Sequence, residues 1–229
     1  MRENIAQVRE KMKAAALRAG RKPEDILLCA ASKVQTPETV ALAQALDIDL
    51  FGENRVQELC QKYDAGAYGS KPVHMIGHLQ TNKVRQTVGR ASMIQSVDSL
   101  RLLQAIDTEA RRQGICQDIL LEINIGGEES KSGMAPRDVW TILEGLSNFP
   151  SVLVRGIMAI PPIAQQKGDN RRFFAEMSQL FVDIEAKKYD NVNMGFLSMG
   201  MSGDYEDAIL EGANIVRVGT AIFGSRYQV

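Results

Sequence analysis

The sequence contains few of the residues on which metal centres and disulfide frameworks depend. Among 229 residues there are 3 cysteines and 2 histidines. Cys29, Cys60 and Cys116 are widely spaced and include no CxxC pair, so we expect reduced thiols, with Cys29 and Cys116 as small packing residues. His74 and His78 have no neighbouring carboxylate or thiol cluster in the sequence, so we expect core or loop packing for both and no metal site.

Excess charge, long apolar runs and common nucleotide or hydrolase motifs are also absent. A net charge of −1 offers no basic surface to nucleic acid or an anionic membrane. Apolar runs such as residues 26–32 are too short to span a bilayer, and the charged, amphipathic N-terminal segment differs from a signal peptide. No GxGxxG follows the first predicted strand, and no GxSxG occurs. We therefore expect a cytoplasmic protein without nucleic-acid or membrane partners.

Segments with helical periodicity alternate with short apolar segments along the chain. Strands are predicted over residues 26–33, 49–54, 72–77, 92–97, 118–125, 152–160, 194–199 and 214–219. Helices are predicted over residues 2–19, 36–46, 55–63, 82–88, 100–112, 136–146, 171–188 and 204–213, with a last short segment after residues 220–224. Eight strand–helix units predict a single (β/α)₈ barrel domain over residues 1–229, with an extra N-terminal helix. An open doubly wound sheet stays possible because the sequence does not reveal strand order.

Polar residues occupy the ends of the predicted strands, where α/β barrels carry their active sites. Because side chains alternate along a strand, Lys33 shares a face with Ala31, and Arg217 shares one with Gly219. A lysine and an arginine inside one barrel are costly unless a polar or anionic group compensates them. The sequence therefore predicts a functional site at the carboxyl-terminal ends of the strands, which we call the barrel mouth. Its candidate residues are Lys33, Asn54, the segment from His74 to His78, Ser96, Asn124, Met158, Ser198, Arg217 and Gly219.

Lys33 and two glycine-containing turns are the strongest candidates at this mouth. A desolvated lysine near a second cation, here Arg217, holds more of the neutral amine that Schiff-base formation needs. The turns, residues 200–203 and Gly219-Thr220, follow the two strands after which barrels commonly bind phosphate. Two plainer interpretations stay open: an exposed lysine just past a strand, and a Ser202 that only caps the following helix.

These residues lie in motifs that resemble the pyridoxal phosphate homeostasis protein family (YggS/PROSC). The resemblance covers nearly the whole chain. Its motifs are residues 31–33 (ASK), 51–58 (FGENRVQE), 74–83 (HMIGHLQTNK), 124–133 (NIGGEESKSG), 156–160 (GIMAI), 197–202 (LSMGMS) and 216–224 (VRVGTAIFG). His78 departs from the pattern because some members carry proline there, which changes the expected shape of that loop.

The resemblance implies a barrel similar to that of alanine racemase, with pyridoxal 5′-phosphate (PLP) held as a Schiff base on Lys33. It also implies that Ser202 and Gly219-Thr220 hold the phosphate, and that Arg217 faces the pyridine nitrogen. The other strand ends expected to contact PLP are Asn54, Met158 and Ser198.

The resemblance further implies a carrier or regulator that balances vitamin B6 and amino-acid pools, without established catalysis. Its expected partners are PLP and apo-enzymes that receive PLP, and we expect a monomer because no long apolar stripe stands out.

Two enzymatic functions stay open beside the carrier. A weak amino-acid racemase needs groups on both faces of the substrate α-carbon, and only Lys33 is expected there. Alanine racemase takes its second base from a β-rich domain for which we expect no room in this chain. Arg217 can only donate to the pyridine nitrogen, which makes the ring a poorer electron sink. A cofactor-free aldolase for sugar phosphates would use the same lysine and turns.

Overall fold

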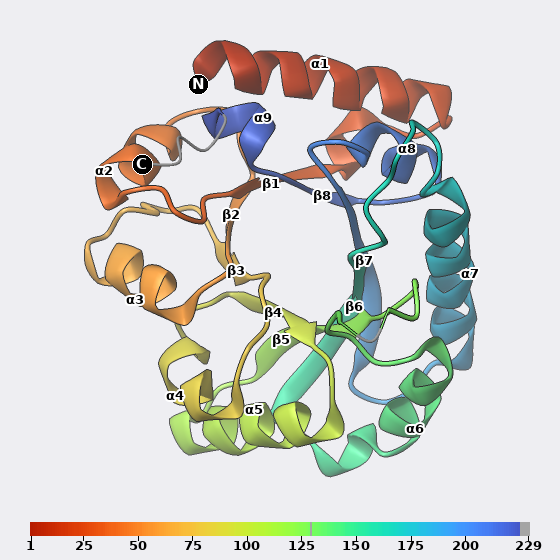
Figure 1. Cartoon of the computed structure of the whole chain (residues 1–229). Coiled ribbons are helices and arrows are strands. Elements are labelled where there is room, and N and C mark those ends of the chain that lie inside the picture. Colours follow the sequence, from red (N-terminus) through yellow and green to blue (C-terminus); the bar gives the residue numbers. More distant parts are fainter. Residues whose placement is uncertain (129, 225–229) are drawn as a thin grey trace.

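The computed structural model describes residues 1–128 and 130–224, in which eight parallel strands form a closed barrel. Each strand pairs with its neighbours in chain order, and the last strand pairs back with the first (Figure 1). The strands are β1 (Leu27–Ala31), β2 (Leu50–Glu53), β3 (Val73–Met75), β4 (Met93–Val97), β5 (Gln117–Ile123), β6 (Val152–Ala159), β7 (Val192–Met201) and β8 (Ile215–Val218). The predicted (β/α)₈ barrel is confirmed, and its closure excludes the open sheet.

Helices surround the barrel, and the extra N-terminal helix is confirmed. They are α1 (Arg2–Arg18), α2 (Pro37–Ala43), α3 (Val56–Asp64), α4 (Val84–Thr87), α5 (Leu100–Gln113), α6 (Val139–Glu144), α7 (Arg171–Lys187), α8 (Tyr205–Leu210) and α9 (Thr220–Phe223). Helix α1 packs across α8 and α9 through a buried stripe that includes Ile5, Val8 and Met12 (Figure 1). Across residues 1–128 and 130–224, no helix combines the length and apolar character that a membrane span requires.

The observed elements differ from the predicted ones mainly at their ends. Short 3₁₀ turns, Thr81–Lys83 and Pro136–Asp138, replace the first residues of two predicted helices. Strand β7 is longer than predicted because it pairs with β6 from Val192 and with β8 as far as Met201. Residue 129 of the predicted loop over residues 126–133, and the last predicted segment beyond residue 224, lie outside the described residues.

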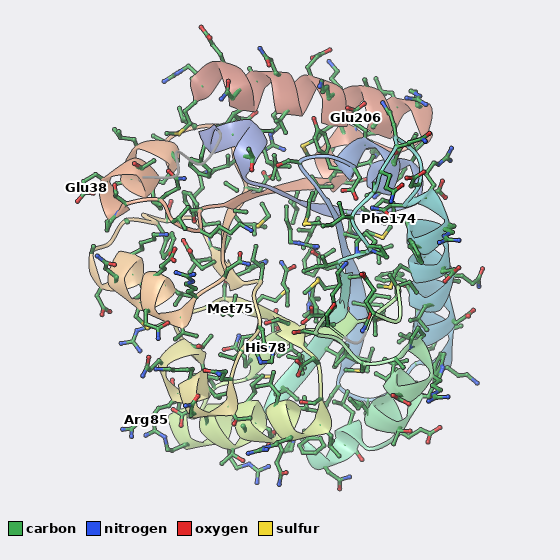
Figure 2. The ribbon with its side chains drawn as sticks, viewed as in Figure 1. Glu38, Met75, His78, Arg85, Phe174 and Glu206 are labelled. Atoms are coloured by element: carbon green, nitrogen blue, oxygen red, sulfur yellow. The ribbon has the colours of Figure 1, made fainter. Side chains whose placement is uncertain are left out.

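Apolar side chains fill both faces of the barrel wall. The outward-facing residues of β8, Val216 and Val218, belong to the large cluster between strands and helices, whereas Ile215 packs inside the barrel with Cys29 and Leu50. This confirms the alternation predicted for β8. The surrounding helices also separate apolar from charged side chains. In Figure 2, Phe174 of α7 points toward the barrel, whereas Arg85 of α4 projects outward.

The three thiols differ in exposure: Cys29 is buried, Cys60 is partly exposed and Cys116 is exposed. Cys29 is buried inside the barrel, and burial raises the pKa of its thiol to about 12. Its predicted packing role is confirmed. Cys116 is exposed because it lies in the connection between α5 and β5, so its predicted packing role is wrong.

Candidate functional site

Lys33 lies in the turn that follows β1 and is half-buried, so the interpretation as an exposed lysine does not hold. The backbone before it approaches the end of β8 closely. A Cβ atom added to Gly219 would lie 3.2 Å from the carbonyl oxygen of Ala31, which is tighter than ordinary contact. Strands β1 and β8 pair in register up to Ala30 and Val218. Lys33 therefore emerges beside the turn that follows β8.

The two glycine-containing turns meet through the hydroxyl of Ser202. Its Oγ accepts hydrogen bonds from the backbone N–H groups of Gly219, at 3.3 Å, and Ala221, at 3.5 Å. The interpretation of Ser202 as a helix cap is wrong, because Asp204 occupies the N-cap position of α8. Both hydrogen bonds are long for N–H donors. A phosphate oxygen would be a stronger acceptor for the same two donors.

Arg217 is buried inside the barrel with 4% of its surface exposed. Its Nη1 donates to Ser198 Oγ at 2.6 Å, and its Nη2 donates to the carbonyl oxygen of Ala159 at 2.9 Å. Burial lowers the pKa of Arg217, and the neighbouring Cys29 and Glu122 oppose this shift. The structure therefore places the predicted cation inside the barrel, held by polar acceptors on β6 and β7.

A chain of hydrogen bonds runs from Arg217 across the barrel to His74. Ser198 Oγ accepts from Arg217 and donates to Gln95 Oε1 at 2.6 Å, and Gln95 Nε2 lies 2.7 Å from His74 Nδ1. Gln95 Oε1 accepts the hydrogen bond from Ser198, and the Gln95 amide nitrogen can only donate, so it donates to Nδ1 of His74. Nδ1 is therefore unprotonated and the histidine is neutral. Burial also lowers the pKa of His74 to about 4. The packing role predicted for His74 is thus incomplete.

Gln95 is a residue that the sequence reasoning missed. It lies in β4 and is completely buried, and its two polar atoms connect β3 with β7. The signal that could have found it is a polar pair, Gln95 and Ser96, at the centre of a strand whose other residues are apolar.

Buried oxygen atoms without a hydrogen-bond partner among the described residues include Asn54 Oδ1, just after β2, Ser96 Oγ on β4 and Glu122 Oε2 on β5. Burial is the main cause that raises the pKa of Glu122 to about 7; Asp98 adds to this shift and Arg217 opposes it. Strand register places Met158 between Glu122 and Ser198. A buried oxygen without a partner is costly, so this part of the barrel suits a polar ligand.

His78 lies in the loop after β3, and its side chain is 55% exposed. Its Nδ1 lies 3.1 Å from Asp98 Oδ2 and 3.3 Å from Ser132 Oγ, so it connects the loop after β3 with the loop after β5. These contacts between loops agree with the loop packing predicted for His78 and exclude a place in the core. The three residues do not form a catalytic triad, because serine and aspartate face the same ring nitrogen, whereas a triad uses both.

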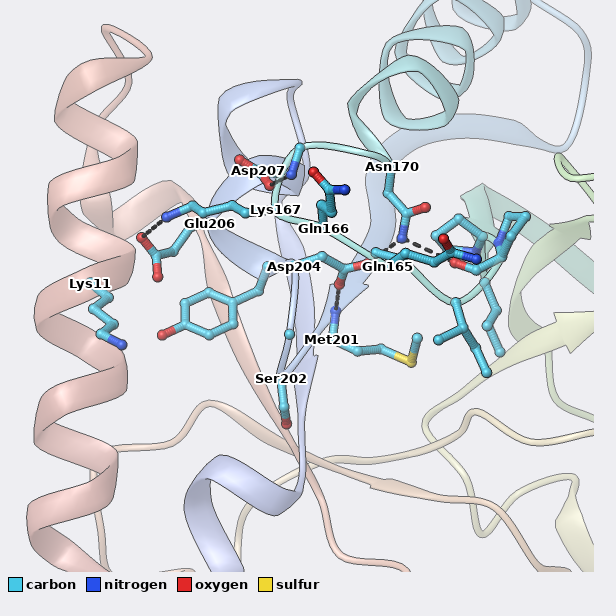
Figure 3. Close-up of a pocket in the computed structure, with 18 of the residues that line it drawn as sticks. Lys11, Gln165, Gln166, Lys167, Asn170, Met201, Ser202, Asp204, Glu206 and Asp207 are labelled. Carbon is cyan, nitrogen blue, oxygen red and sulfur yellow. Dashed lines mark hydrogen bonds and ion pairs between the residues drawn. The ribbon is translucent and has the colours of Figure 1, made fainter.

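A cavity of about 640 Å³ borders the turn that carries Ser202. Figure 3 shows Lys11 of α1 on one side of this cavity and Asn170 on the other. The Asp204 carboxylate accepts hydrogen bonds from the N–H of Met201 at 2.7 Å and from Asn170 Nδ2 at 2.8 Å. These bonds hold the Ser202 turn against the loop after β6. The cavity is large enough for a small organic ligand next to the proposed phosphate turns.

Comparison with known proteins places this geometry in a family. The family model for the alanine racemase N-terminal domain matches residues 1–227. A pyridoxal phosphate homeostasis protein of Aquifex aeolicus is 40% identical over 224 residues, which are 98% of this chain and 97% of that protein.

Solved structures agree with this placement. An unknown protein from Bifidobacterium adolescentis is similar with a TM-score of 0.90 and 33% identity, covering 96% of this chain and 93% of that one. PipY of Synechococcus elongatus PCC7942, a structure with PLP bound, is similar with a TM-score of 0.80 and 31% identity, covering 93% of this chain and 99% of that one. The chain therefore belongs to the pyridoxal phosphate homeostasis protein family, with the barrel fold of the alanine racemase N-terminal domain.

Proposed function

We propose that this protein binds PLP at the barrel mouth and holds it as a Schiff base on Lys33. The observation that carries this proposal is the half-buried Lys33 beside two turns that Ser202 joins. The relative PipY, whose structure has PLP bound, supports the same cofactor here. The unpartnered oxygen atoms of Asn54 and Glu122 also favour a polar ligand in this barrel.

The chemistry requires an unprotonated amine, an aldehyde and a site that holds the phosphate. Lys33 would supply the amine, and PLP, when bound, would supply an aldehyde with which an unprotonated lysine can condense with loss of water and without oxidation or reduction. Ser202, Gly219 and Thr220 would bind the phosphate, and Arg217 would donate to the pyridine nitrogen.

Three further residues would complete the proposed PLP site. Ser198 would hold the Arg217 guanidinium, with which it shares a hydrogen bond, and Met158, its register partner, would provide apolar contact. Asn54 would offer a polar contact from β2.

The proposed role is that of a carrier or regulator, which captures PLP, holds it and releases it to apo-enzymes. We propose that it acts in the cytoplasm as a monomer. Arg217 agrees with this role but does not decide against catalysis by itself, because alanine racemase shares such an arginine; a guanidinium can only donate to the pyridine nitrogen and so disfavours its protonation. An unprotonated ring withdraws electrons less effectively from a carbanion.

The test is to incubate the purified protein with PLP, record its absorbance, and reduce it with borohydride before peptide mass analysis. We expect absorbance in the violet region and a mass fixed on Lys33, both absent in Lys33→Ala. The matched control is Lys13→Ala, which removes an exposed lysine of α1 and should behave as the unchanged protein. Absence of both signals in the unchanged protein would refute the proposal.

Two measurements separate the carrier from the enzymes. Incubation of the PLP-loaded protein with L-amino acids in heavy water reports α-proton exchange. Exchange at rates typical of enzymes, lost in Lys33→Ala, would favour a racemase. A colourless protein that borohydride traps only in the presence of a sugar phosphate would indicate an aldolase.

A further inference from the structure

A buried ion pair lies behind Lys33, between β2 and α3. Glu53 and Lys62 have 0% and 1% of their surfaces exposed, and Lys62 Nζ lies 2.7 Å from Glu53 Oε1. Lys62 Nζ also donates to the carbonyl oxygen of Ser32 at 2.8 Å. The hydroxyl of Ser32 donates to Glu53 Oε1 at 2.6 Å. The pair therefore holds both the backbone and the side chain of the residue that precedes Lys33.

Glu58 holds the residue on the other side of Lys33. Its Oε2 accepts a hydrogen bond from the backbone N–H of Val34 at 2.7 Å. Glu58 lies one helical turn before Lys62 on α3, and its Oε2 is 3.5 Å from Lys62 Nζ. The Ser32 carbonyl and the Val34 N–H belong to the two peptide bonds that flank Lys33. Side chains of one helix thus hold both peptide groups.

The turn needs this support because its backbone is strained. Val34 has a φ of 62°, a left-handed conformation that is unfavourable for a β-branched residue. The hydrogen bond to Glu58 offsets part of that strain. The hydroxyl of Ser32 points back toward Glu53, so the residue before Lys33 is fixed on the side of the barrel wall that faces α3.

Energetics indicate that the pair serves geometry rather than stability. Two buried charges gain little over well-packed apolar residues of similar volume, because both must lose their hydration. An apolar pair could not hold the Ser32 carbonyl, whereas the Lys62 ammonium can. The ion pair therefore gives the turn a defined position that apolar packing alone would not supply.

We propose that Glu53, Glu58 and Lys62 are positioning residues that orient Lys33 for imine formation with PLP. This inference rests on the proposed function of Lys33. The three side chains lie between the barrel wall and α3 and would act through the backbone of the turn.

The test uses Glu58 because its side chain is 19% exposed, so its replacement should leave the protein folded. In Glu58→Ala, the Val34 N–H loses its acceptor. We expect the ratio of imine to unreacted bound PLP at equilibrium to fall about tenfold. The affinity for pyridoxine 5′-phosphate, which has the phosphate but no aldehyde, should not change. Glu58→Gln keeps an acceptor oxygen and should restore imine formation. Gln57→Ala, an exposed neighbour on α3, is the matched control.

The outcomes separate this inference from the proposed function. If the unchanged protein forms no imine, the proposed function itself fails. If it does, and Glu58→Ala forms imine to the same extent, the positioning role is refuted. An equal loss of pyridoxine 5′-phosphate affinity in Glu58→Ala would also refute it, because the change would then affect the whole site. The positioning role is established if Glu58→Ala forms less imine, Glu58→Gln restores imine formation, and the affinity for pyridoxine 5′-phosphate is unchanged in both variants.

Discussion

Replacing Lys62 with methionine would leave the Glu53 carboxylate buried without its cation. Glu53 would keep the hydroxyl donors of Ser32 and Tyr68, and the Ser32 carbonyl would lose the Lys62 ammonium. Removal of one partner from a buried ion pair costs about 3–5 kcal/mol. We expect Lys62→Met to lose about 3 kcal/mol in the free energy of unfolding near neutral pH, because these hydroxyl donors remain.

The loss should depend on pH, with a sign that follows from the pKa of Glu53. Burial raises the pKa of Glu53, and the hydrogen bond from Lys62 opposes this shift. Without Lys62 the folded-state pKa should rise further above the unfolded value. The folded variant then binds more protons than the unfolded chain, so its stability falls as pH rises through that window. The deficit relative to the unchanged protein should be smaller at about pH 5 than at about pH 8.

Urea unfolding of the PLP-free protein, followed by circular dichroism at both pH values, measures this effect. We expect a lower midpoint with an unchanged dependence on urea concentration. The double variant Lys62→Met/Glu53→Gln should recover part of the loss because it removes the unpaired charge. Lys13→Met, at an exposed site of α1, is the control and should change stability by less than about 0.5 kcal/mol. The reasoning would be refuted if Lys62→Met lost no more free energy of unfolding than Lys13→Met, or if its loss were the same at both pH values.

Three further predictions concern the barrel interior and mouth. Arg217→Ala should weaken PLP retention during dialysis and shift the absorbance of bound PLP while circular dichroism stays unchanged; unaltered retention and absorbance would show that Arg217 does not contact PLP. Ser202→Ala removes the acceptor that joins the two turns and should lower PLP affinity about tenfold by calorimetry, whereas equal affinity would exclude Ser202 from the phosphate site. Burial lowers the pKa of His74 to about 4, so as pH falls the unfolded chain binds a proton at this histidine before the folded protein does. The free energy of unfolding should therefore fall by about 3 kcal/mol as pH is lowered from about 6.5 to about 4. A ¹⁵N NMR titration of His74 with a midpoint near pH 6.5 would contradict this.

Local pattern in the sequence was sufficient for the eight strand–helix units and for several of the candidate residues. Alternation along β8 placed Arg217 inside, because neighbouring side chains in a strand must point to opposite faces. Glycine-containing turns after the last two strands indicated where Ser202 and Gly219 would lie. Short helices were predicted less well: the segment over residues 136–146 contains only a brief α6 between 3₁₀ turns.

The sequence by itself determined the alternation of strands with helices and the inward position of Arg217, because both follow from periods of two and of 3.6 residues. Only the tertiary structure decided that the eight strands close into a barrel, because strand order depends on pairing between distant segments. Only the tertiary structure decided that Arg217 is linked through Ser198 and Gln95 to His74, since Ser198 and Gln95 are separated by 103 positions in the chain. Likewise, no local pattern assigns Lys62 to the carbonyl of Ser32, 30 positions away. Closure of the barrel sets which strands and helices become neighbours, and hydrogen bonds between distant side chains form only after those neighbours are in place.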